Sequence, residues 1–121
     1  MKVHEDLSSF LPLSPSKFYV LLSLAEGDKH GYAILKDVAR QTQGQVQFSA
    51  STLYGIIQQL ETQRLIRESG SRPDPALDDE RRRYYCLTDL GRQVAAAEAQ
   101  RLKDAVSLAE DRKLVPNERT T

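Results

Sequence analysis

The stretch SASTLYGIIQQLETQR, residues 49–64, decides the fold of this chain together with the segments that follow it up to Thr88. Its apolar residues recur with the spacing of one face of an α-helix, at Leu53, Ile56, Ile57 and Leu60. Two short apolar segments come next, LIRE at 65–68 and YYCL at 84–87, separated by a loop with glycine and prolines. Such segments, bounded by turn residues, are typical of the strands of a hairpin. The stretch therefore predicts a helix followed by a two-stranded hairpin.

Two shorter helices are expected before this stretch. Ser14 and Pro15 suit the N-cap and the first position of one helix, whose buried stripe comprises Phe18, Leu21, Leu22 and Ala25. The second is expected from residue 30 or 31 to about residue 43, and the alternating residues 45–48 favour a short strand. Three helices and a hairpin in this order predict a mainly α fold, a winged helix-turn-helix with a two-stranded wing.

A long fourth helix is expected after the hairpin, with Thr88 as its N-cap and its end near Asp111. Such a helix would extend about 36 Å, more than so small a core can cover. One stripe along it is apolar and would need a partner, for which a second copy of the chain is the simplest choice. The expected dimer interface comprises Ala95, Ala99, Leu102, Val106 and Ala109.

The chain divides into four expected regions. Residues 1–13 show no periodicity and are expected to form a flexible arm, and residues 14–88 form the winged helix-turn-helix domain. Residues 89–111 form the dimerisation helix, and the polar residues 112–121 form a disordered tail.

Composition excludes several classes of protein. Lys and Arg number 17, equal to Asp and Glu, which argues against a protein that coats nucleic acid without sequence preference. Cys86 is the only cysteine, which fits a reducing compartment and leaves no internal disulfide. Residues 18–25 are the longest apolar run and are far too short to cross a bilayer. Because Glu5, Asp6 and Pro12 interrupt any apolar core at the start, no signal peptide is expected, and we expect a soluble, cytoplasmic protein.

The helix at 49–64 carries an uncharged polar face opposite its apolar one. Amides can pair with adenine edges and hydroxyls with bases or phosphates, so this face favours DNA binding over an ordinary solvated surface, which is usually rich in Lys and Glu. Arginines at the wing would lie beside the phosphate backbone or a minor groove, unless they only neutralise the acidic residues 78–80. The expected DNA-binding residues are Lys36, Ser51, Thr52, Tyr54, Gln58, Arg72, Arg82 and Arg83.

Other chemistry finds little support in the sequence. His30 is expected to bond a backbone group at a helix start, since no second ligand stands at a metal-binding spacing. Cys86 is expected to be a packed strand residue. The chain lacks a phosphate-binding loop, a nucleophile elbow and paired carboxylates on rigid elements. We therefore expect no enzyme, no metal and no cofactor.

Four blocks in this order resemble the PadR family of bacterial transcriptional regulators: HGYAI at 30–34, TLYGI at 52–56, LI at 65–66 with RRRYY at 81–85, and LTDLG at 87–91. The resemblance implies a homodimer whose reading helix enters the major groove of an operator while the wing contacts the flanking backbone. It also implies repression of nearby genes, released by a small molecule or a stress signal. The length is similar to that of the short subfamily, with a single C-terminal helix. The drug-binding members use a tryptophan at the dimer centre, which this chain lacks.

The sequence thus predicts a sequence-specific regulator, a homodimeric repressor on a pseudo-palindromic operator. The alternative is a winged-helix module that docks a protein partner and does not bind DNA. The balanced charge keeps this alternative open.

Overall fold

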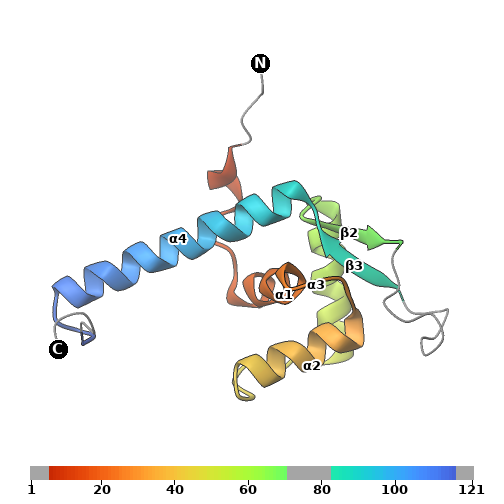
Figure 1. Ribbon diagram of the computed structural model, residues 1–121, viewed down its shortest axis with the longest axis horizontal. Coiled ribbons are helices and arrows are strands. Elements are labelled where there is room, and N and C mark those ends of the chain that lie inside the picture. The colour runs from red at the N-terminus through yellow and green to blue at the C-terminus, as the bar shows by residue number, and fades with distance from the viewer. Residues whose placement is uncertain (1–5, 71–82, 117–121) are drawn as a thin grey trace.

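The computed structural model describes residues 6–70 and 83–116. In chain order its elements are the 3₁₀ helix η1 (Leu7–Phe10), α1 (Pro15–Ala25), β1 (Lys29–His30), α2 (Gly31–Gln41), α3 (Ala50–Thr62), β2 (Ile66–Ser69), β3 (Tyr84–Leu87) and α4 (Asp89–Asp111). The fold is mainly helical, with a small antiparallel sheet beside α3 and the start of α4 (Figure 1). This architecture confirms the predicted fold class.

Each α-helix begins at a residue whose side chain caps it. The side chains of Ser14, His30, Ser49 and Thr88 accept hydrogen bonds from the backbone N–H groups three residues later, at Lys17, Ala33, Thr52 and Gly91. An N-cap acceptor satisfies one of the backbone donors that lack a partner in the first turn. The expected starts of all four helices, and the expected role of His30, are confirmed.

The sheet has one strand more than the sequence predicted. β3 lies in the middle, pairing Tyr84 with Ser69 of β2 on one side and with His30 of β1 on the other. β1 has only two residues, too few for a periodic pattern. It holds the start of α2 against the wing.

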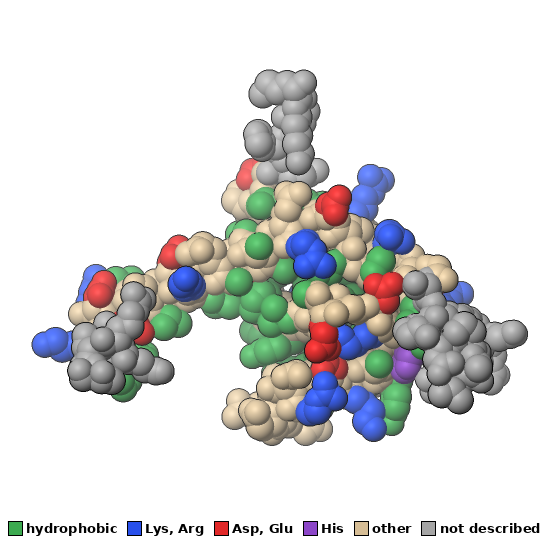
Figure 2. All heavy atoms as spheres, viewed as in Figure 1, with side chains coloured by type: hydrophobic (Ala, Val, Ile, Leu, Met, Phe, Trp, Pro, Cys, Tyr) green, Lys and Arg blue, Asp and Glu red, His purple; other side chains and the backbone are tan. Residues whose placement is uncertain are grey.

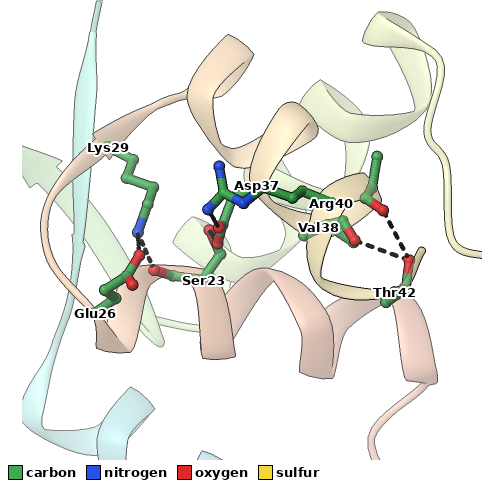
Figure 3. A network of polar contacts seen from close by, with 8 residues as sticks. Ser23, Glu26, Lys29, Asp37, Val38, Arg40 and Thr42 are labelled. Carbon is green, nitrogen blue, oxygen red and sulfur yellow. Dashed lines mark hydrogen bonds and ion pairs between the residues drawn. The ribbon is translucent and has the colours of Figure 1, made fainter. Parts of the chain in front are cut away.

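The strand expected at residues 45–48 is wrong. That segment is part of the turn between α2 and α3, and Thr42 organises it instead. The Thr42 hydroxyl donates to the carbonyl oxygen of Val38 (2.8 Å), as drawn in Figure 3, and accepts from the N–H of Val46 (3.0 Å). Gly44, at φ +80°, lies in the left-handed region that favours glycine. An alternating pattern forms a strand only where another strand is available to pair with it.

The core is made from all four helices and the sheet. The stripe expected on α1 is wrong in part: Leu21 is buried, but Leu22 and Ala25 are exposed while Val20 and Leu24 are buried. α1 contacts α2, α3, α4 and β3, so it buries a wider arc than a surface helix does. The other apolar side chains that are almost completely buried are Ile34, Val38, Leu53, Ile57, Leu60, Leu65, Ile66 and Val94.

The part of the expected N-terminal arm that the structure describes, residues 6–13, is packed rather than free. η1 contacts α4, and Leu13 is buried in the core. The backbone N–H of Leu13 donates to Oε1 of Glu98 on α4 (3.3 Å). Apolar residues without helical spacing thus cover one side of α4, a role that a search for periodicity does not detect.

α4 is packed at its start and unpartnered beyond. Val94, Ala95 and Glu98 are buried, whereas residues 99–108 are all exposed, and this half of the helix extends away from the rest of the fold in Figure 1. Ala95 is 8% exposed inside the core of its own chain, which leaves little of it for a partner. No helix among the described residues combines the length and apolarity needed to cross a membrane.

Candidate nucleic-acid interface

α3 presents two faces of different chemistry. Leu53, Ile57 and Leu60 are buried, and the opposite side exposes a set that we call the reading face. A Cβ at Gly55 would meet no atom within 4 Å, so the helix backbone is open to close approach at that point. The reading face comprises Ser51, Thr52, Tyr54, Gly55 and Gln58, all exposed and all uncharged.

The hydroxyl groups at the start of α3 are held in place by the helix cap. The Ser49 hydroxyl accepts from the N–H of Thr52 (3.2 Å) and donates to the Thr52 hydroxyl (2.9 Å). The Ser51 hydroxyl lies 3.4 Å from the Ser49 hydroxyl oxygen. A side chain with a fixed orientation loses less conformational freedom when it binds.

Tyr54 connects α3 to the start of α2. Its phenol lies so close to Gly31 that a Cβ there would overlap the Tyr54 hydroxyl oxygen. Even so, Tyr54 is 49% exposed, so one side of the ring packs on α2 and the other is available to a ligand. Gly31, from the HGYAI block, is required here for close approach.

A group at the start of α2, which we call the aromatic–basic cluster, adjoins the wing. It comprises His30, Tyr32 and Lys36. The rings of His30 and Tyr32 are stacked with centroids 6.5 Å apart, and Nζ of Lys36 lies 5.3 Å from the Tyr32 ring centroid. His30 also contacts the Tyr84 ring of β3 edge-on, at 5.3 Å.

The sequence predicts Lys36 in the interface but not Tyr32, which is 57% exposed. Its spacing of four residues from Lys36 places the two side chains on one face of a helix, and this was the available signal.

Of the expected wing arginines, the structure describes Arg83, and Arg72 and Arg82 lie outside the described residues. Arg83 is exposed, and its Nη1 lies 3.8 Å from Oε2 of Glu68 on the neighbouring strand. An exposed ion pair of this length contributes little to stability, so the guanidinium can turn to another anion at small cost.

Cys86 is buried, as expected for a packed strand residue. Within residues 6–70 and 83–116, no group of three or more His, Cys, Asp or Glu side chains is arranged to hold a metal ion.

Residues 20–97 match the model of a family described as the transcriptional regulator PadR-like family. The chain belongs to the PadR-like family of transcriptional regulators. The matched residues run from α1 into α4 and include the reading face, the aromatic–basic cluster and the wing.

Curated relatives share part of their sequence with this chain. An uncharacterized 37.1 kDa protein in transposon TN4556 of Streptomyces fradiae is 34% identical over 84 residues, 69% of this chain and 22% of that protein. The chain spans less than two thirds of the length of the curated relatives that it matches.

Solved structures show the same fold. A transcriptional regulator from Clostridium thermocellum is similar with TM-score 0.64 and 21% identity, over 91% of this chain and 97% of that chain. Bacillus subtilis PadR in complex with operator DNA is similar with TM-score 0.57 and 22% identity, over 71% of this chain and 47% of that chain.

Proposed function

We propose that this PadR-like protein is a sequence-specific DNA-binding regulator that represses transcription as a homodimer on a pseudo-palindromic operator. The observation that carries the proposal is the reading face, an exposed helix surface without a charged residue. Beside it lie an exposed lysine stacked on tyrosine and an exposed arginine at the wing. Polar groups for base edges flanked by cations for phosphates are what recognition of double-stranded DNA requires.

The residues divide into two roles. On the reading face, Gln58 and Thr52 contact base edges in the major groove, and Ser51 and Tyr54 contact bases or the adjoining phosphates. The basic side chains bind the phosphates of the DNA backbone and position the protein on it. They are Lys36 of the aromatic–basic cluster and the wing arginines Arg72, Arg82 and Arg83. Because the charge of the chain is balanced overall, affinity comes from the placement of these few cations.

The exposed half of α4 supports the homodimer. Leu102 is 37% exposed and Val106 50%, and with Ala99 and Ala109 they form the remaining apolar stripe. Covering this stripe with its two-fold copy removes it from water. The same axis repeats the reading face about one helical turn away, roughly 34–36 Å, as a palindromic site requires.

A small molecule or a stress signal releases the protein from the operator. The regulator meets its DNA in the cytoplasm. The family assignment supports a regulator rather than an enzyme.

A footprint and a gel-shift titration of the DNA upstream of the protein's own gene, at about 50 and 200 mM salt, test the proposal. We expect protection of a two-fold symmetric site with half-site centres about 10 base pairs apart, and affinity that falls with salt. If no DNA is retarded at the lower salt, the alternative, a winged-helix module that docks a protein partner, replaces the proposal.

A further inference from the structure

A cavity of about 320 Å³ lies between α1 and α2, outside the reading face and the aromatic–basic cluster. This volume is at the lower end of the range of small-molecule sites, about 300–1,000 Å³. In Figure 2 hydrophobic side chains gather between α4 and α2. The lining residues are Tyr19, Leu22, Ser23 and Glu26 from α1 and its end, and Asp37, Val38 and Gln41 from α2.

The cavity contains a buried carboxylate. Asp37 is 6% exposed, and its Oδ2 accepts a hydrogen bond from the Ser23 hydroxyl (2.8 Å) while its Oδ1 accepts from Nη2 of Arg40 (2.6 Å). Figure 3 shows the carboxylate between these two groups. A carboxylate can accept about four hydrogen bonds, so Asp37 retains capacity for another donor.

Both charged residues that line the cavity are acidic, and their basic partners do not line it. Arg40 reaches Asp37 with a side chain that is 69% exposed. Nζ of Lys29 lies 3.0 Å from Oε1 of Glu26, whose side chain is 65% exposed. One member of each pair is exposed to solvent, Arg40 in one and Glu26 in the other, so a cation bound in the cavity can take the place of either base.

We propose that this cavity binds a small organic cation with an apolar or aromatic body, and that it is the effector site of the regulator. The ammonium group donates to Asp37 in place of Arg40, with Glu26 at the rim, and the body packs on Tyr19, Leu22 and Val38. An apolar wall with a few convergent polar groups is the usual chemistry of a ligand site. The two carboxylates favour a ligand with a positive charge.

The effector role rests on the proposed function. Val38 lines the cavity, and its carbonyl oxygen holds the Thr42 hydroxyl that organises the turn into α3. α2 also packs directly on α3. A ligand bound between α1 and α2 therefore favours a position of the reading face that differs from the one that binds DNA. The loss of DNA affinity depends on how much more tightly the ligand binds the first arrangement than the second.

Binding is tested with three probes that share one body, 4-phenylbutylamine, 4-phenylbutan-1-ol and 4-phenylbutanoate, titrated into ¹⁵N-labelled protein at about pH 7. We expect the amine to shift the amide signals of Ser23, Asp37 and Gln41 saturably. It should bind about tenfold more tightly than the alcohol, the ratio for one hydrogen bond to a charged group, and the carboxylate should not bind. Equal affinity of amine and alcohol, or shifts confined to other elements, would overturn the proposal.

Four variants sharpen the test. Asp37→Asn keeps the volume and the Ser23 contact and should weaken amine binding about tenfold, whereas Arg40→Gln removes the resident cation and should strengthen it. Glu26→Gln, an exposed change that spares folding, should weaken binding less. Asp111→Asn, exposed at the end of α4, is the control and should change nothing. If Asp37→Asn does not fold, the opposite effects of Arg40→Gln and Glu26→Gln decide, and unchanged affinity in both rejects the site.

The effector role is tested on the operator complex. The amine should weaken DNA binding by about fivefold or more in the parent protein and not in Asp37→Asn. If the amide shifts appear but DNA affinity does not change, the effector role is wrong and the binding site stands. If the protein binds no DNA at all, the proposed function fails, and the amide shifts still decide the cavity.

Discussion

Gly91, in the first turn of α4, lies directly against the backbone of Leu65 at the junction of α3 and β2. A Cβ at Gly91 would overlap the carbonyl oxygen of Leu65, and this oxygen also accepts a hydrogen bond from the N–H of Thr88 (3.1 Å). The Thr88 hydroxyl donates to the carbonyl oxygen of Arg64 (2.6 Å). The first turn of α4 is therefore fixed on the end of α3, and this contact sets the direction in which the long helix leaves the domain.

Gly91→Ala should lower the free energy of unfolding by about 1–3 kcal/mol, because the added methyl group forces the two backbones apart. Urea denaturation followed by circular dichroism measures the change. Gly55→Ala is the control: its position is open, so better helix propensity should raise stability by about 0.5–1 kcal/mol. Equal stability of Gly91→Ala and the parent protein would show that α4 tolerates a shift at this contact.

Gln58→Ala and Lys36→Ala should separate base reading from backbone binding. Loss of the Gln58 amide should cost about 1–3 kcal/mol on the operator and little on random DNA. Loss of Lys36 should weaken binding to both and reduce the slope of log K against log salt by about one. Gel-shift titrations of each variant with both DNAs measure these effects. An equal loss on both DNAs for Gln58→Ala would assign Gln58 to the backbone.

Val106→Glu should convert the protein to a monomer at micromolar concentration and abolish operator binding. It removes an apolar side chain whose full burial is worth about 1.5–3 kcal/mol, and in a symmetric seam it brings like charges together. Analytical ultracentrifugation measures the mass, and circular dichroism should show an intact fold. Gln100→Glu, exposed and off the apolar stripe, adds the same charge and should remain dimeric. A dimeric Val106→Glu would place the interface on another surface.

Glu98→Gln should make the free energy of unfolding depend less on pH in the acidic range. The Arg101 guanidinium donates to both carboxylate oxygens of Glu98 (2.8 and 2.7 Å) and holds its pKa below the ordinary value of 4.5. Because the folded-state pKa is the lower one, this stabilisation is complete above the ordinary value and is lost as the pH falls through the folded-state value.

Urea denaturation between about pH 3 and 7 tests this prediction. Glu98→Gln should be less stable than the parent at neutral pH by about 1.5–3 kcal/mol, and the gap should close in acid. Asp111→Asn is the matched exposed control and should follow the parent. A gap that is constant with pH would show that Glu98 acts through packing alone.

Features set by neighbouring residues could be predicted from the sequence. The caps Ser14, His30, Ser49 and Thr88 follow from a side-chain acceptor placed three residues before a free N–H, and β3 was predicted with its observed bounds. The long α4 followed from an unbroken run of helix formers. The uncharged face of α3 also followed from helical spacing, whereas its contacts with DNA remain a prediction.

Features that depend on distant residues were missed or wrong. β1 needs β3 as its partner, and Glu98 bonds to Leu13, which lies near the other end of the chain. The buried arc of α1 depends on how many elements surround that helix. The cavity at Asp37 likewise needs residues from both α1 and α2. The sequence by itself determined the helices, their starts and their chemical faces, because these depend on hydrogen bonds and side-chain spacing within a few residues. Only the tertiary structure decided which faces are covered and which remain exposed, because burial depends on contacts between segments that are far apart in the chain.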